Sequence, residues 1–174
     1  MKKTLLMIAT LLSTVLGTAH AGEGKKASYD APAVSGVNQD GKAVNFTDVY
    51  AKGPTVVFFY PKADTPGCTK QACSLRDAFA DLSKDGVQVL GVSFDKAEAQ
   101  KAFQDKFKLP YDLIADPEGK IVEAFKVEKM LRGVLSLAKR SCFLIKGGKV
   151  IWEDFQASTD KQAEDIKRVL AETK

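Results

Sequence analysis

Histidine is almost absent from the chain, which has a single copy, His20, among 174 residues. That histidine lies in an N-terminal segment that we expect to be cleaved. The mature protein would then have no histidine, which excludes a Cys-His dyad, a Ser-His-Asp triad and any metal site that needs an imidazole ligand. A nucleophile in this chain must therefore be activated without an imidazole base.

The chain also lacks internal repeats, low-complexity tracts and a strong excess of either charge. Its 26 Lys and Arg residues and 22 Asp and Glu residues give a formal net charge of +4. A mild excess without a basic stripe does not indicate nucleic acid as a partner. With 45% hydrophobic residues, a chain of this length is sufficient for one domain with a sizeable core.

No apolar run near the N-terminus is long enough to remain as a membrane span. The apolar stretch at residues 4–16 follows Lys2 and Lys3 and precedes an Ala-x-Ala cleavage pattern at residues 19–21. These features predict a signal peptide at residues 1–21 and an exported, periplasmic protein without stable membrane association. No cysteine follows the cleavage pattern, which argues against a lipoprotein.

We interpret residues 22–28, which are polar and glycine-rich, as a flexible lead-in, and residues 29–174 as a single domain. Apolar strand-like runs alternate with amphipathic helical segments, and Asp-Gly and Gly-Gly turns indicate two hairpins. The expected strands are 55–60, 87–93 and 113–114, the expected helices are 68–84, 96–107, 121–125 and 160–172, and the expected hairpins are 37–44 and 142–152. The order predicts an α/β fold with parallel crossovers and a mixed sheet.

Cysteine is scarce, and two of the three cysteines are only five residues apart. Cys68 follows the apolar run 56–60, which Pro61 ends, and the turn formed by Pro66 and Gly67. The apolar residues after it have helical spacing, so Cys68 is expected in the first turn of a helix. The free N–H groups and positive dipole at a helix start stabilise a thiolate, which is the nucleophilic form of cysteine.

The residues alone leave a second interpretation open for this pair. Exported cysteines are usually bridged, so Cys68 and Cys73 could form a structural disulfide. The odd number of cysteines, with two close together, instead favours one working pair and one spectator, Cys142.

A longer motif surrounds the first cysteine: residues 60–69 read Tyr-Pro-Lys-Ala-Asp-Thr-Pro-Gly-Cys-Thr. This run resembles the peroxiredoxins and, within them, matches the signature of the bacterioferritin comigratory protein or peroxiredoxin Q group residue for residue. Pro61, Thr65 and Cys68 fit the broader Pro-x3-Thr-x2-Cys pattern. The resemblance extends from about residue 29 to the C-terminus. It implies a thioredoxin-like fold, with a central mixed sheet flanked by helices and an N-terminal hairpin, and a monomer.

The resemblance also implies a function: a thiol-dependent peroxidase that reduces hydrogen peroxide and organic hydroperoxides without a cofactor or metal. Cys68 would be the peroxidatic nucleophile and Cys73 the resolving cysteine. Their intramolecular disulfide would be recycled by an external dithiol donor, either a thioredoxin-like protein or a membrane-fed thiol relay. Pro61 and Thr65 would complete the site. From its position before the helix alone, Thr65 is also a candidate helix cap, and the two roles are compatible. Arg140 stands where the family has an arginine beside the reactive sulfur.

The segment around Arg140 departs from the family in two respects. Cys142 occupies a position where the family more often has Thr, and the segment 127–139, at the expected substrate mouth, does not follow the common pattern. Strand alternation places Arg140, Cys142 and Leu144 on one face. We interpret Cys142 as a small buried core residue.

The cysteine spacing and the lack of further ligands also bear on two other classes of function. A disulfide oxidoreductase favours Cys-x-x-Cys at the helix start, whereas Cys68 and Cys73 have a Cys-x4-Cys spacing. A copper-binding module would need further soft ligands or histidines. An exported thioredoxin-like disulfide oxidoreductase is therefore the alternative, and reduction of an insulin-type disulfide would distinguish it from a peroxidase.

Overall fold

The computed structural model describes residues 24–133 and 135–173, so the expected signal peptide at residues 1–21 lies outside the described residues. The strands of the main sheet are β1 (Lys25–Asp30), β2 (Ser35–Asn38), β3 (Ala43–Asn45), β4 (Thr55–Phe59), β5 (Gln88–Ser93), β6 (Asp112–Ala115), β9 (Ser141–Lys146) and β10 (Lys149–Asp154). The helices are α1 (Phe46–Tyr50), α2 (Pro66–Lys84), α3 (Ala97–Phe107), α4 (Lys120–Ala124) and α5 (Gln162–Glu172). Within the described residues, no helix is long and apolar enough to cross a membrane.

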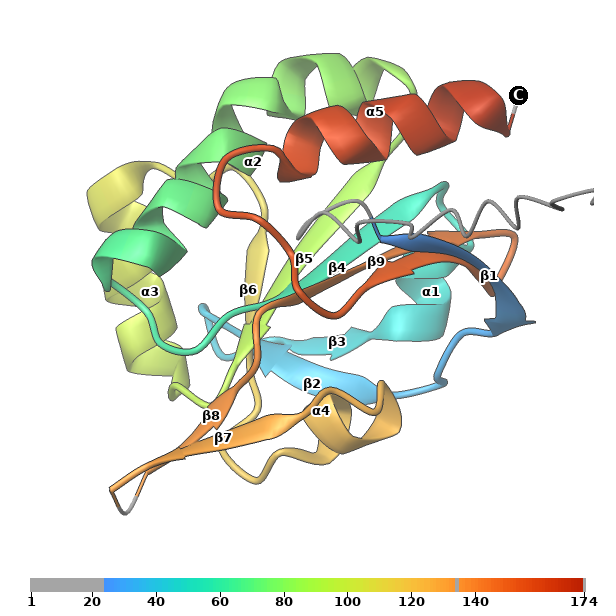
Figure 1. Ribbon diagram of the computed structural model, residues 1–174. Helices are drawn as coiled ribbons and strands as arrows, with labels where there is room; N and C mark the ends of the chain where they lie inside the picture. The colour runs from blue at the N-terminus through green and yellow to red at the C-terminus, as the bar shows by residue number, and fades with distance from the viewer. Residues whose placement is uncertain (1–23, 134, 174) are drawn as a thin grey trace, which may run out of the picture.

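The main sheet has the strand order β1-β10-β9-β4-β5-β6-β2-β3 and carries helices on both faces (Figure 1). Strands β4, β5 and β6 are parallel, whereas β9, β10 and β1 on one side and β2 and β3 on the other are antiparallel to their neighbours. The predicted mixed sheet flanked by helices is confirmed, as are the helices after β4 and β5 and both expected hairpins.

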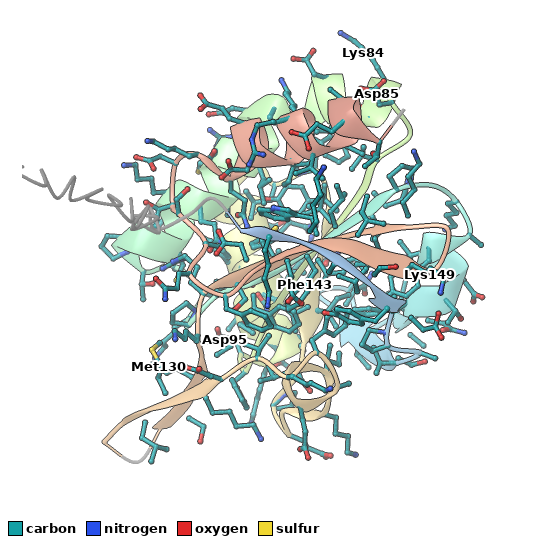
Figure 2. All side chains as sticks on the ribbon, turned by 45° about the vertical axis from the view of Figure 1, so that its right-hand side comes forward. Lys84, Asp85, Asp95, Met130, Phe143 and Lys149 are labelled. Carbon is teal, nitrogen blue, oxygen red and sulfur yellow. The ribbon has the colours of Figure 1, made fainter. Side chains whose placement is uncertain are left out.

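Strand β4 lies in the middle of the sheet and is buried along its whole length. Its side chains alternate between two cores: Val56 and Phe58 pack under α2, α3 and α5, whereas Val57 and Phe59 pack with α1 and α4. Phe143 of β9 belongs to the second core and lies in the interior of the molecule (Figure 2). Helices on both faces explain why β4 reads as a continuous apolar run rather than an alternating one.

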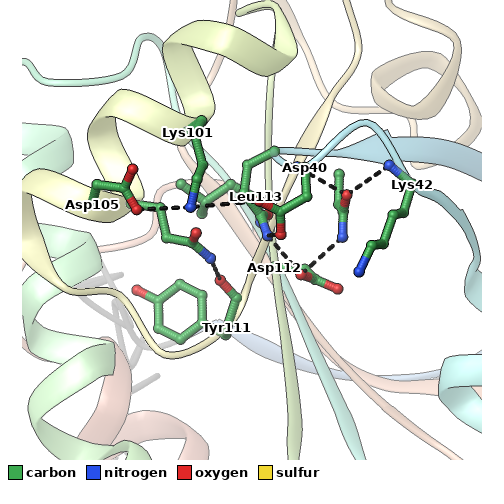
Figure 3. Close-up of polar contacts among 10 residues, drawn as sticks. Asp40, Lys42, Lys101, Asp105, Tyr111, Asp112 and Leu113 are labelled. Carbon is green, nitrogen blue, oxygen red and sulfur yellow. Dashed lines mark hydrogen bonds and ion pairs between the residues drawn. The ribbon is translucent and has the colours of Figure 1, made fainter.

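A polar network attaches the N-terminal hairpin to the rest of the fold (Figure 3). The Asp112 carboxylate accepts hydrogen bonds from the Asn38 and Gln39 side chains, at 3.2 and 3.0 Å, and Gln39 Oε1 accepts from the Leu113 amide at 2.8 Å. Lys101 of α3 pairs with Asp40 at the hairpin turn. The hairpin is therefore fixed to β6 and α3 by side chains as well as by strand pairing.

The expected flexible lead-in at residues 22–28 is wrong for residues 25–28. These residues belong to β1, which pairs with β10 through Lys26↔Trp152 and Tyr29↔Val150. The domain therefore begins earlier than residue 29. Most side chains of β1 are exposed, because it is an edge strand, so its order comes from backbone pairing rather than from an apolar pattern.

A hairpin that the sequence did not predict precedes β9. Strands β7 (Lys129–Arg132) and β8 (Leu135–Ala138) form a separate two-stranded sheet that projects from the body of the molecule (Figure 1). Met130 lies on this hairpin (Figure 2), and it and Leu131 are exposed by 39% and 80%. The hairpin accounts for most of the segment 127–139 that departs from the family pattern.

Cys142 lies in the interior of β9, between Phe58 of β4 and Asp154 of β10, and is fully buried. Burial raises the pKa of its thiol well above the ordinary value, so the thiol stays protonated at neutral pH. We therefore expect Cys142 to resist iodoacetamide in the folded protein, both before and after one equivalent of peroxide, and to react in urea. Peptide mass spectrometry would check this, and a disulfide between Cys142 and either other cysteine would contradict it.

Candidate active site

Helix α2 begins at Pro66, directly after the loop that follows β4, and Cys68 is its third residue. Proline suits this first helical position because its missing N–H would have no helical partner there. The predicted placement of Cys68 in the first turn of a helix is thus confirmed. Cys68 is only 2% exposed and belongs to the core beneath α2.

Thr65 occupies the N-cap position, but its side chain does not cap the helix. Its hydroxyl donates instead to the Lys62 carbonyl at 3.0 Å, within the loop. The expected side-chain cap is therefore wrong, although the Thr65 carbonyl accepts from the Thr69 amide at 2.8 Å. As a result, Thr65 leaves the N–H groups of the first turn available to an anion beside Cys68.

Arg140 reaches Cys68 from the start of β9, the strand that pairs with β4. Because β9 runs antiparallel to β4, with Ser141 opposite Phe59, the residue before β9 lies beside the loop that enters α2. The Arg140 guanidinium lies with Nη2 3.6 Å from Cys68 Sγ. The structure thus brings together the two residues that the resemblance pairs, and it places Cys142 and Leu144 in the same core cluster as Cys68.

Two buried glutamines behind Arg140 were missed in the sequence. Arg140 Nη1 donates to Gln71 Oε1, and Gln71 Nε2 donates to Gln162 Oε1 at 2.9 Å. Gln71 is inaccessible to solvent and Gln162 is 1% exposed. Gln71 lies three residues after Cys68, hence on the same face of α2, and this spacing was a signal that could have identified it.

A cleft of about 550 Å³ opens beside Cys68. Its walls come from the loop after β4, from the start of α2, and from β8 and the residue before β9. They consist of Pro61, Lys62, Ala63, Asp64, Thr65, Cys68, Leu137 and Arg140. All the predicted site residues except Cys73 therefore line one cavity, and Leu137 joins them from the hairpin that the sequence did not predict.

The loop after β4 forms one wall of this cleft, and contacts made by Asp95 and Asp64 hold it in place. Asp95 accepts a hydrogen bond from the Ala63 amide and another from the Ser93 hydroxyl, both at 2.8 Å. Asp64 has a φ of 54°, in the left-handed region, and its carboxylate pairs with Lys106 of α3 at 2.7 Å. These contacts fix the backbone that carries Pro61 and Thr65.

Cys73 lies on the same uninterrupted helix as Cys68 and is partly buried, and both thiols are free. On a regular helix, residues five apart are rotated by about 140° and their Cα atoms are about 9 Å apart. This rotation turns Cys73 away from the face of α2 that carries Cys68. Within residues 24–133 and 135–173, no group of three Cys, Asp, Glu or His side chains is placed to hold a metal ion.

Comparison with known proteins places this geometry in a family. Residues 27–153 match the model of the AhpC/TSA family. Peroxiredoxin Bcp of Escherichia coli K12 is 43% identical over 139 residues, which are 76% of this chain and 88% of that protein. The chloroplastic peroxiredoxin Q of Suaeda salsa is 44% identical over 104 residues, which are 60% of this chain. The chain spans about half the length of this and other plant and fission-yeast relatives.

A solved structure agrees with the sequence comparisons. The crystal structure of peroxidoxin BcpB from Mycobacterium tuberculosis superposes with a TM-score of 0.75 at 30% identity, and the match covers 89% of this chain and 99% of that one. The family model spans most of the chain, and the Escherichia coli relative matches it over most of both sequences. The chain therefore belongs to the AhpC/TSA family and, within it, to the peroxiredoxin Bcp/Q group.

Proposed function

We propose that the protein is a thiol-dependent peroxidase in which Cys68 is the nucleophile and Cys73 resolves the oxidised product. The observation that carries the proposal is the approach of Arg140 Nη2 to within 3.6 Å of Cys68 Sγ, at a helix start that opens into a cleft. A guanidinium and a helix N-terminus both stabilise a thiolate, so no imidazole base is needed.

In the first step, the Cys68 thiolate attacks one oxygen of the peroxide. An S–O bond forms as the O–O bond breaks, the sulfur is oxidised to a sulfenic acid, and the other oxygen leaves as hydroxide or alkoxide and takes up a proton. The same Arg140 side chain and the first-turn N–H groups lie where this negative charge develops. Hydrogen peroxide and organic hydroperoxides share the reacting O–O group, and both are proposed substrates.

In the second step, the Cys73 thiol displaces water from the Cys68 sulfenic acid and a disulfide forms. A dithiol donor then reduces the disulfide by exchange and is itself oxidised. The Cys-x4-Cys spacing and the cationic cleft favour this cycle over a disulfide oxidoreductase, because an oxidoreductase needs neither a peroxide cleft nor Arg140 at the sulfur. We propose that the protein acts as a monomer.

Export is part of the proposal and is supported by the sequence pattern of residues 1–21. An exported enzyme cannot be reached by cytosolic thioredoxin, so its dithiol donor would be a thioredoxin-like protein or a thiol relay supplied through the membrane. N-terminal sequencing of the protein recovered from the periplasm would test this, and we expect Gly22 as the first residue.

The roles of the two cysteines are distinguishable by single substitutions. Cys68→Ser should abolish peroxide consumption, because a serine hydroxyl is not ionised near neutral pH. Cys73→Ser should allow one rapid turnover and then stop as a sulfenic or over-oxidised species. Peroxide consumption with a panel of dithiol donors, followed by intact mass, measures both, and substantial turnover by Cys68→Ser would refute the assignment.

Arg140 should contribute to the first step rather than to reduction of the disulfide. Arg140→Ala should slow single-turnover oxidation of Cys68 by ~10²-fold, as expected for the loss of one preorganised donor. Arg140→Lys should recover little, since a lysine cannot reproduce the planar fork that contacts both Cys68 and Gln71. Stopped-flow rates within threefold of wild type for the alanine variant would remove Arg140 from the site.

Formation of the disulfide should unwind the start of α2. A disulfide requires a Cα separation of at most about 7 Å, which is shorter than an intact helix provides between Cys68 and Cys73. We expect amide exchange across residues 66–78 to be slow in the reduced protein and much faster in the oxidised one, while amides of β9 keep their protection. Equal protection in both states, with the disulfide confirmed by mass, would contradict the unwinding.

A further inference from the structure

The amide of Gln71 must have a defined orientation for Arg140 to be held at Cys68. A guanidinium has only donors, so it can be satisfied by the oxygen of an amide but is repelled by the NH2 group. Gln71 presents Oε1 to Arg140 Nη1. Rotation of the Gln71 amide by half a turn would place NH2 against the guanidinium and leave Arg140 without this partner.

Gln162 supports this orientation at the other end of the Gln71 amide. It is the first residue of α5, and its Oε1 accepts the hydrogen bond of 2.9 Å from Gln71 Nε2. Both side chains are almost completely buried, so solvent is not available to replace either bond. Because Gln71 must donate to Gln162, its oxygen is left for Arg140.

The orientation of Gln162 is matched to that of Gln71. Its Nε2 is buried and has no hydrogen-bond partner among the described residues. The reverse orientation would set two NH2 groups against each other at Gln71. The start of α5 is held on α2 by the Lys70–Asp160 ion pair at 2.7 Å and by the Ser74 hydroxyl, which donates to the Asp160 carbonyl.

We propose that Gln162 is a positioning residue for the reactive cysteine: it fixes the Gln71 amide, which holds Arg140 Nη1 and so directs Nη2 to the Cys68 sulfur. The inference deepens the proposed function, since it assigns a remote residue to the same first step. It assigns no contact between Gln162 and the substrate.

The test removes the polar group of Gln162 and keeps its length. Gln162→Met should lower the stopped-flow rate of Cys68 oxidation by about tenfold, the size expected for one buried hydrogen bond, and should move the pH midpoint of Cys68 alkylation upward. The alkylation readout does not require peroxidase activity. If wild-type protein failed to consume peroxide, the proposed function would fail, and the alkylation midpoint would still test Gln162.

Measuring the same substitution in a Gln71→Glu variant separates a positioning role of Gln162 from a role in folding. A carboxylate at position 71 presents an acceptor to Arg140 in either orientation, so the penalty of Gln162→Met should shrink to within threefold when it is measured against Gln71→Glu. Gln162→Leu provides a second apolar variant in both backgrounds. Val169→Ala, in the same helix but in the apolar core, is the matched control: it should lower the unfolding midpoint without moving the alkylation midpoint.

An equal penalty of Gln162→Met or Gln162→Leu in the two backgrounds would overturn the inference, because it would assign Gln162 a purely structural role. An unchanged alkylation midpoint in the Gln71 background would overturn it as well. The inference is supported if Gln162→Met slows Cys68 oxidation when residue 71 is Gln but not when it is Glu.

Discussion

The close approach of the Arg140 guanidinium to the Cys68 sulfur is the constraint on which the site depends. A thiolate that is 2% exposed would be strongly disfavoured in an apolar core unless a cation and hydrogen-bond donors replaced water. The two residues are 72 positions apart in the sequence, and the fold joins them because β9 returns antiparallel to β4, next to the loop that enters α2. The central strand pair is therefore as much a part of the site as the cleft.

The proposed chemistry makes opposing demands on α2. The first turns must be helical for Cys68 to react and must open for Cys73 to reach it. The polar contacts that hold these turns include the Gln71 amide, the exposed Lys70–Asp160 ion pair, the Ser74 hydroxyl on the Asp160 carbonyl and the Tyr111 hydroxyl, which donates to the Ala72 carbonyl at 2.7 Å. Net contributions of about 1 kcal/mol for a buried hydrogen bond and 0–1 kcal/mol for an exposed ion pair give a total of only a few kcal/mol.

The rest of α2 is held differently. Beyond residue 78, Leu82 of α2 is buried and Phe79 packs against the core, and a buried leucine contributes about 1.5–3 kcal/mol. The distribution of contacts along the helix thus makes local opening at its start less costly than separation of the whole helix. Unwinding that began at Cys68 would also withdraw Gln71 from Arg140, so resolution would dismantle the arrangement that activates the sulfur.

The elements that the sequence predicted are those with a local signal. The run 56–60, the helical spacing after Cys68 and the Asp-Gly turn of the N-terminal hairpin all report burial or backbone conformation at neighbouring positions. Strand β1 was missed because an edge strand with exposed side chains shows no alternation of apolar and polar residues. Gln162 was missed because its role depends on a contact with Gln71, 91 residues away, which no local pattern records.

The two walls of the cleft differ in how firmly they are held, and this difference bears on substrate choice. The loop wall is fixed by Asp95 and by the Asp64–Lys106 pair. The opposite wall, Leu137, belongs to the two-stranded β7–β8 sheet, which is closed at its base by Lys139, whose amide donates to the Glu128 carbonyl at 2.8 Å. An isolated two-stranded sheet is only marginally stable. In the proposed reaction, Cys68 and Thr65 lie on the firmly held side and Gln71 holds Arg140, whereas Leu137 on the adaptable side would contact only the remainder of the peroxide. For the proposed peroxide substrates, sequence change in the hairpin can therefore alter the fit while the geometry at Cys68 stays the same.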